Sequence, residues 1–205
     1  MYQSQVSISL AETYLGARTG ENVLNGKIYR GAQETIDAGI MFCDIRGFTS
    51  MSEALGAEGI IPVINQIFDI IGGCVTSVGG EILKFIGDAM LVIFPYDSLE
   101  EEEKVAQNMI KAAQKSITEV EALGGSHEFP VSVGFGCHIG EVLYGNIGTL
   151  NRFDFTVMGP AVNLTSRLEG LCKPLGVKII ASERVYQKYS ELTHLGVQKV
   201  KGVSE

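Results

Sequence analysis

Hydrophobic and polar residues follow patterns along this chain that switch several times between strand and helix periodicity. The run AGIMFCDI, residues 38–45, is apolar and has the length of a buried strand. From Ile60 to about Val78 the large apolar residues instead recur at helical spacing, which predicts an amphipathic helix. Ser50 and Glu53 have the spacing of a capping box and predict that a helix starts there.

The pattern continues as a mixture of strands and helices. EILKFI and AMLVIF flank Gly87-Asp88 and predict two strands joined by a tight turn. The acidic start DSLEEEEK predicts a helix through Ile117, and Pro160 stands where a further helix favours proline. VSVGFGCHIGEVLYGNIG and RFDFTVMG are strand-like, and KII and a short helix near SERVYQKY follow. An α+β or α/β layered sheet is expected.

Residues 1–37 differ from the rest because they are polar, glycine-punctuated and without a sustained period. We interpret them as an N-terminal connector or leader, with a decoration of the following domain as the equal alternative, and 38–205 as one folded domain. The apolar stretch GIIPVINQIFDIIGGCVTSVGG contains Asn65, Gln66 and Asp69, so it predicts a buried helix rather than a membrane span.

Composition limits the partners of this chain. Its 205 residues are 45% hydrophobic and carry a net charge of −8, which argues against nucleic acid or an anionic membrane as partner. No signal peptide is visible, and the scattered cysteines suit free thiols in the cytoplasm; they are Cys43, Cys74, Cys137 and Cys172. An acidic protein that handles a polyanionic substrate needs a metal cation between them.

Two acids stand where strands end: Asp44 after the first strand and Asp88 in the hairpin turn. If these strands are neighbours, both carboxylates meet at one edge and repel each other unless a hard cation such as Mg²⁺ lies between them. Phe48 and Thr49 then lead into a helix N-terminus, which attracts phosphate. The alternative for each acid alone is a turn or cap residue.

Three further polar residues have unusual surroundings. Lys84 shares a strand face with isoleucines, where an ammonium needs an acceptor or water. Asn163 and Arg167 are four residues apart and share one helix face, which suits a phosphoryl group with developing negative charge. A lysine extending from an edge strand and a solvated helix face are the alternatives.

Four segments in succession resemble the motifs of the class III nucleotidyl cyclase catalytic domain. They are FCDIRGFTSMSE, KFIGDAMLVIF, GCHIGEVLYGNIG and FDFTVMGPAVNLTSRLEGL, in the family's order and covering about four-fifths of the chain from Gly39 to Lys201. The resemblance implies a ferredoxin-like, palm-type α+β fold with a mostly antiparallel sheet. It also implies a head-to-tail homodimer that converts ATP to 3′,5′-cyclic AMP and pyrophosphate.

The resemblance assigns a role to each candidate residue. Asp44, Asp88 and the carbonyl of Ile45 would bind two Mg²⁺ or Mn²⁺ ions per site. In the catalytic step Asn163 would orient the ribose and Arg167 would stabilise the α-phosphate. The substrate-binding residues would be Lys84 and Thr156 at the base, Phe48 and Thr49 near the phosphates, and Lys201 at a phosphate. One subunit would supply the acids and the other the base, ribose and α-phosphate contacts.

The base contacts favour ATP. Lysine donates to the bare N1 of adenine and a threonine hydroxyl accepts from N6, whereas guanine presents N1–H and an exocyclic amine, which are both donors. The strand VSVGFGCHIG lacks the arginine that family members often carry there, and Arg46 is the candidate to replace its charge. Guanylate cyclase and a catalytically silent regulatory module remain the alternatives, and Gly-Gly-[Asp/Glu]-Glu-Phe diguanylate cyclases do not match. An upstream sensor or regulatory domain is the expected partner.

Overall fold

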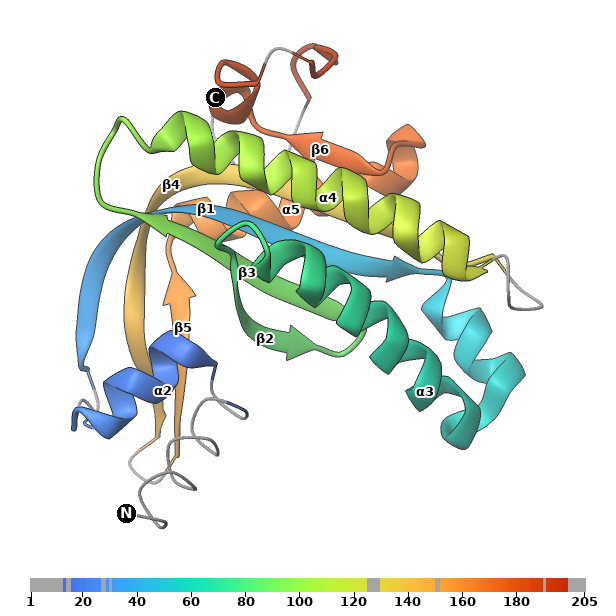
Figure 1. The fold of residues 1–205 in the computed structure, drawn as a ribbon, viewed down its shortest axis with the longest axis horizontal. Helices are drawn as coiled ribbons and strands as arrows, with labels where there is room; N and C mark the ends of the chain where they lie inside the picture. Colours follow the sequence, from blue (N-terminus) through green and yellow to red (C-terminus); the bar gives the residue numbers. More distant parts are fainter. Residues whose placement is uncertain are drawn as a thin grey trace.

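The computed structural model describes residues 13, 16–26, 29, 31–124, 130–149, 152–189 and 191–198, which form a six-stranded sheet with helices on both faces (Figure 1). The strands are β1 (Gln33–Arg46), β2 (Glu81–Ile86), β3 (Ala89–Tyr96), β4 (Ser132–Thr149), β5 (Arg152–Met158) and β6 (Ile179–Ala181). Their order is β2-β3-β1-β4-β5, with β6 beside β4. Among the described strands, β4 and β6 pair in parallel and all other pairs are antiparallel. The predicted α+β fold with a mostly antiparallel sheet is confirmed.

The helices are α2 (Ala17–Leu24), α3 (Phe48–Thr76), α4 (Glu102–Gly124), α5 (Pro160–Leu175) and α6 (Glu183–Tyr186). In Figure 1, α3 and α4 cover the front of the sheet, while α5 lies behind it. Pro160 is the first residue of α5, as predicted. Helix α4 continues past the predicted end at Ile117, because Val120 still packs into the core.

Strand β1 is buried on both sides. Its side chains point alternately to the two sides of the sheet, and this determines where its polar residues lie. One side enters the large core formed with α3 and α4 through Met41, Cys43 and Ile45. Ile40 lies on the other side, in the cluster that includes the start of α5. Because successive side chains of a strand point to opposite faces, Asp44 and Arg46 follow Ile40 onto the α5 side.

Glycines on β4 allow α5 to lie directly on the sheet. Gly136 pairs with Phe42 of β1, and a Cβ at Gly136 would lie 2.4 Å from both the amide nitrogen of Glu169 and the carbonyl oxygen of Thr165. No side chain fits in that space, so only glycine permits this approach of helix and strand. The contact carries Glu169 of α5 to the end of β1 where Asp44 lies.

Helix α3 begins earlier than the sequence predicts. Its N-cap is Gly47, in the left-handed conformation with φ 70°, and its first residue is Phe48, without a side-chain cap. The predicted capping box is therefore wrong, since Ser50 lies inside the first turn. Glycine adopts positive φ without steric cost, which lets the helix start directly after β1. Gly56, with φ 68° and ψ 175°, then kinks the helix between its short first part and its long second part.

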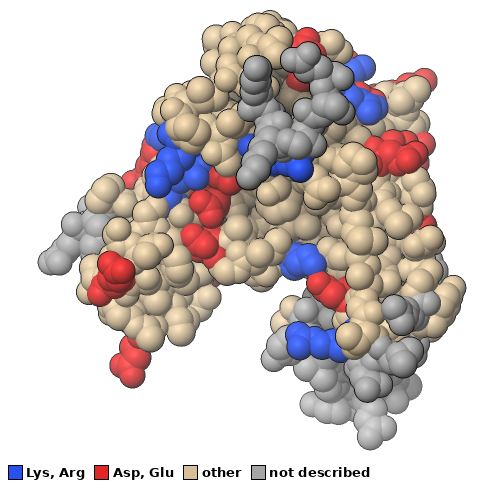
Figure 2. Space-filling model, turned by 180° about the vertical axis from the view of Figure 1, so that it is seen from behind, with Lys and Arg blue, Asp and Glu red and all other residues tan. Residues whose placement is uncertain are grey.

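Among the described residues, α3 is the one helix long and apolar enough to cross a membrane. However, Ile67, Ile71 and Val75 of α3 are buried in the core shared with α4. The interactions of this helix are thus those of a core helix, as predicted from its polar interruptions. On the face seen in Figure 2, basic and acidic residues are interspersed over a mostly uncharged surface, with no broad basic patch in its described part.

Candidate active site

Asp44 and Asp88 lie together at one edge of the sheet. Asp44 pairs with Ala89 across the β1–β3 ladder, and the amide of Ile45 donates a 3.3 Å hydrogen bond to the carbonyl of Asp88. Both acids and Ile45 line one cavity of about 540 Å³. The structure thus brings the two acids together as the strand pattern predicts, while their binding of a metal stays a prediction.

The electrostatics of this cavity suit a cation. The pKa of Asp44 is raised, mainly because its carboxylate is partly buried and next because Asp88 is close; Arg46 and Lys173 act in the opposite direction. The described residues hold no cluster of three or more His, Cys, Asp or Glu side chains that would bind a metal by themselves. Two carboxylates and a carbonyl fit Mg²⁺ or Mn²⁺, which complete their shells with water and substrate oxygens.

The N-terminus of α3 forms another wall of the same cavity. Phe48, Thr49 and Ser50 line it. Amides in the first turn of a helix have no acceptor within the helix, and the positive end of the helix dipole lies there. The predicted contact of Phe48 and Thr49 with phosphate therefore has a suitable location beside the acids.

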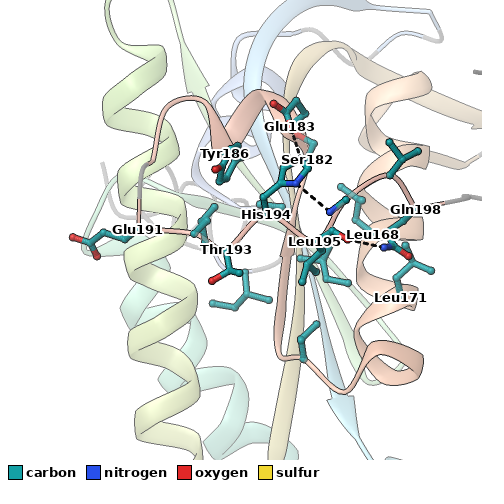
Figure 3. Close-up of a pocket in the computed structure, with 17 residues that line it drawn as sticks. Leu168, Leu171, Ser182, Glu183, Tyr186, Glu191, Thr193, His194, Leu195 and Gln198 are labelled. Carbon is teal, nitrogen blue, oxygen red and sulfur yellow. Dashed lines mark hydrogen bonds and ion pairs between the residues drawn. The ribbon is translucent and has the colours of Figure 1, made fainter.

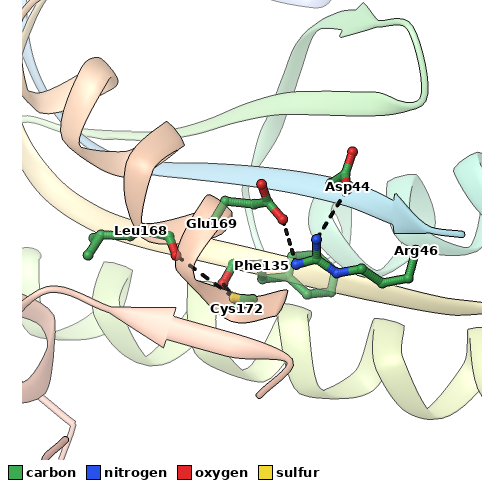
Figure 4. Close-up of polar contacts among 6 residues, drawn as sticks. All are labelled: Asp44, Arg46, Phe135, Leu168, Glu169 and Cys172. Atoms are coloured by element: carbon green, nitrogen blue, oxygen red, sulfur yellow. Dashed lines mark hydrogen bonds and ion pairs between the residues drawn. The ribbon is translucent and has the colours of Figure 1, made fainter. Parts of the chain in front are cut away.

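Arg46 extends from the end of β1 between two carboxylates (Figure 4). Its Nη1 lies 3.3 Å from Oδ2 of Asp44, and its Nη2 lies 2.6 Å from Oε1 of Glu169 on α5. The pKa of Glu169 is raised, chiefly by burial, although Arg46 opposes that shift. The sequence pattern does not reveal Glu169, because its partner lies on a distant strand and no short-range spacing connects them.

Lys84 finds the acceptor that its apolar surroundings require. Its Nζ lies 2.5 Å from Oδ2 of Asp154 on β5. A register irregularity between Ile82 and Lys84 interrupts the β2–β3 ladder. Sequence reasoning missed Asp154, yet one signal was present: Asp154 is two residues before Thr156 and so shares its strand face.

Thr156, Asn163 and Arg167 lie apart from the acids. Thr156 is buried on β5, Asn163 is exposed and Arg167 is half-buried on α5. Within the described part of the chain, neither these three residues nor Lys84 lines the cavity of Asp44 and Asp88. Lys201 falls outside the described residues. A single chain thus presents two separate groups of the predicted site residues.

His138, in the GCHIG segment, connects two elements of the fold. Its Nδ1 and Oγ of Ser182 are joined by a 2.7 Å hydrogen bond that links β4 to the start of α6. Burial, and secondarily the positive charge of Arg184, lower the pKa of His138 to about 4. The imidazole is therefore neutral at pH 7 and connects two elements of the fold.

Another cavity, of about 670 Å³, lies elsewhere, between α5, β6, α6 and residues 191–198 (Figure 3). Aliphatic side chains such as Leu168 and Leu171 dominate its wall, and His194 lies 3.7 Å from Glu183 at its edge. Neither acid of the pair lines it. The smaller cavity is the candidate active site because the paired acids and the α3 N-terminus meet there.

An antiparallel sheet with two acids at one edge and a helix N-terminus beside them is an arrangement that suits phosphate groups accompanied by a cation. The sequence model of the family described as adenylate and guanylate cyclase catalytic domain matches residues 31–205. The chain belongs to this family.

Relatives with known names agree with this assignment. The adenylate cyclase of Anabaena cylindrica is 39% identical over 161 residues, which are 78% of this chain and 32% of that enzyme. The terminal-differentiation specific adenylate cyclase of Dictyostelium discoideum is 36% identical over 146 residues, covering 70% of this chain and 7% of that protein. The chain thus spans a third or less of the length of these curated relatives.

Solved structures share the fold. The adenylyl cyclase CyaB from P. aeruginosa superposes with a TM-score of 0.74 at 28% identity, covering 84% of this chain and 91% of that one. The guanylyl cyclase Cya2 gives 0.68 at 29% identity, covering 84% and 89%. An adenylyl cyclase and a guanylyl cyclase therefore resemble this chain about equally in sequence. The nucleotide base that this chain prefers must be inferred from individual residues.

Proposed function

We propose that this domain is an adenylate cyclase that converts ATP to 3′,5′-cyclic AMP and pyrophosphate. The convergence of Asp44 and Asp88 in a cavity that also contains the N-terminus of α3 carries the proposal. Such a cavity suits a triphosphate accompanied by cations. The 39% identity with a relative named adenylate cyclase supports the same reaction.

Asp44, Asp88 and the carbonyl of Ile45 would hold the metal, as two Mg²⁺ or Mn²⁺ ions per site. When bound, such ions lower the pKa of a coordinated hydroxyl and neutralise phosphate charge. The chain itself places two acids in one partly buried cavity, next to helix amides that can donate hydrogen bonds to phosphate oxygens. Its contribution is to position the reactants and to exclude other arrangements.

The complete site would be shared by two copies of the chain. The acids lie in one cavity, whereas Lys84, Thr156, Asn163 and Arg167 lie outside it, so each chain supplies half of the contacts. Exposed apolar residues close to Lys84 and Thr156 in sequence favour contact with another copy; they are Phe85 and Ile86 on β2 and Met158 on β5. A head-to-tail dimer with twofold symmetry would then have two equivalent sites.

In that dimer, Asn163 would orient the ribose and Arg167 would stabilise charge on the α-phosphate as pyrophosphate departs. The fixed, planar guanidinium suits this purpose because it donates several N–H groups at once. Lys201 remains a proposed phosphate contact. The products leave without covalent attachment to the protein, so its side chains act by charge and orientation.

Lys84 and Thr156 would read the base. Asp154 accepts from the Lys84 ammonium, which has three N–H donors and so keeps two for a ligand. A donor at this position pairs with N1 of adenine and faces N1–H of guanine unfavourably. The proposed preference for ATP over guanine nucleotide is therefore about tenfold to a hundredfold.

The domain would work as part of a larger cytoplasmic protein. Relatives are much longer than this chain, which is consistent with an upstream sensor or regulatory domain. We propose that residues 1–37, of which Ala17–Leu24 form a helix, connect to it and that 38–205 form the catalytic unit. All four cysteines are free thiols, as a reducing compartment requires.

Turnover by the purified protein tests the proposal. With Mn²⁺, at protein concentrations where sedimentation confirms dimers, ATP is expected to yield cyclic AMP and pyrophosphate in equal amounts, with GTP at least about tenfold less efficient. A preference for GTP would make the protein a guanylate cyclase. No cyclic product from either nucleotide would refute the proposal and favour the silent regulatory module.

A further inference from the structure

The guanidinium of Arg46 bridges two carboxylates but lies closer to one of them (Figure 4). Nη2 is 2.6 Å from Oε1 of Glu169, whereas Nη1 is 3.3 Å from Oδ2 of Asp44. Asp44 is the predicted metal ligand, and Glu169 has no assigned role. The geometry therefore raises the question of why a second acid competes for this arginine.

Strand β4 is built to allow the bridge. Gly134 pairs with Asp44, and a Cβ at Gly134 would lie 1.8 Å from Nη2 and 2.4 Å from Cζ of Arg46. Any side chain there would displace the guanidinium from its present position. Gly136, two residues on, allows the close approach of α5 that brings Glu169 within reach. Two glycines on the same strand face thus define the path of Arg46.

Burial makes the Glu169 contact the stronger of the two. The Glu169 side chain is 15% exposed, against 30% for Asp44. Nη2 and Oε1 are both buried, and at a separation of 2.6 Å their opposite charges attract each other directly. Charges attract more strongly where less water surrounds them. Glu169 therefore draws the guanidinium toward α5.

We propose that Glu169 is a positioning residue of the active site, which holds Arg46 back from Asp44 and so leaves the Asp44 carboxylate available to a divalent cation. This inference rests on the proposed function. Without the charge of Glu169, Arg46 would pair with Asp44 alone and compete with the cation for the same oxygens. The cation and the guanidinium would also repel each other more strongly.

Mn²⁺ binding to the nucleotide-free protein, measured by electron paramagnetic resonance of unbound Mn²⁺, tests the inference. Glu169→Gln is expected to bind Mn²⁺ about tenfold more weakly than the wild type. In turnover assays its half-saturating Mn²⁺ concentration should rise by a similar factor, while kcat at saturating Mn²⁺ changes little. Glu103→Gln, which removes one exposed acid from α4, is the matched control and should bind like the wild type.

Two more variants separate positioning from a structural role. Arg46→Gln combined with Glu169→Gln removes the competing guanidinium and should restore Mn²⁺ affinity to within about twofold of the wild type. Gly134→Ala displaces Nη2 by contact and should weaken Mn²⁺ binding in the same direction as Glu169→Gln. A pair that only stabilised the fold would show no such rescue.

Unchanged Mn²⁺ affinity in Glu169→Gln, or a double variant no better than the single one, would overturn the inference. If the wild type forms cyclic AMP in that case, the proposed function survives. If the wild type binds no Mn²⁺ and also forms no cyclic product, both the inference and the proposed function fail. If the variants show the expected order of Mn²⁺ affinities but the wild type forms no cyclic product, only the proposed reaction is refuted.

Discussion

Asp44→Asn and Arg167→Ala should each form cyclic AMP at least about a hundredfold more slowly than the wild type, yet an equimolar mixture should recover about a quarter of the wild-type rate. At the proposed metal site, asparagine would remove a charged ligand. Because bound metal would stabilise the transition state by several kcal/mol, the expected loss of rate is about a thousandfold or more. Alanine at position 167 would remove the donors proposed to face the departing phosphate charge, and such a loss typically lowers the rate about a hundredfold to a thousandfold.

Recovery in the mixture follows from the separation of the two groups of residues. Random exchange makes about half of the dimers mixed, and each mixed dimer has one intact site among its two. The control is a mixture of Asp44→Asn with Asp88→Asn, in which both changes fall on the same half of the site. That mixture should remain inactive. No recovery in the first mixture, with mixed dimers confirmed by mass spectrometry, would show that one chain forms the whole site.

Lys84→Met should lower kcat/KM for ATP by about tenfold to a hundredfold and leave the low activity with GTP nearly unchanged. The reason is the loss of the donor proposed to pair with N1 of adenine, which would leave that acceptor unpaired in the complex. Asp154→Asn keeps the ammonium but removes its charged partner at 2.5 Å, so a smaller effect in the same direction is expected. Steady-state kinetics with ATP and with GTP measure kcat/KM for each variant.

A matched control for Lys84 is Lys104→Met, which removes an exposed lysine from α4 without altering the base pocket. Its selectivity should equal that of the wild type. If Lys84→Met reduces activity with ATP and GTP by the same factor, Lys84 does not read the base, and its pairing with Asp154 is structural.

The sequence predicted the features that depend on local patterns. The hairpin around Gly87-Asp88 follows from two apolar runs and a tight turn, and the start of α5 follows from Pro160. The meeting of Asp44 and Asp88 needed one further assumption, that their strands are neighbours. It holds because β1 and β3 pair side by side. Local signals were sufficient for half of the candidate site.

The starts of β1 and α3 were predicted less accurately than the hairpin and the start of α5. The first strand was expected to start at residue 38, but β1 begins at Gln33, because its polar start still pairs with β4 through Gly145 and Tyr144. Backbone pairing leaves no hydrophobic pattern where side chains face solvent. The start of α3 was misplaced for a related reason, since the conformation of Gly47 and not a side-chain cap determines it.

The ion pairs of the site could not be predicted. Lys84 pairs with Asp154, and Arg46 with Glu169, across segments that are far apart in the sequence. Each requires the sheet to be assembled first, and the second also requires Gly134 to leave space for the guanidinium. A sequence pattern shows that a buried lysine or arginine needs a partner, but the fold decides which acid supplies it.

Anomalous diffraction from Mn²⁺ in crystals grown with a non-reactive ATP analogue would locate the metal ions and the nucleotide in the same experiment. We expect Mn²⁺ peaks bound by Asp44 and Asp88 of one subunit, with the α-phosphate near Arg167 of the partner subunit. Mn²⁺ bound away from these two acids, or a nucleotide held by one subunit alone, would contradict this expectation.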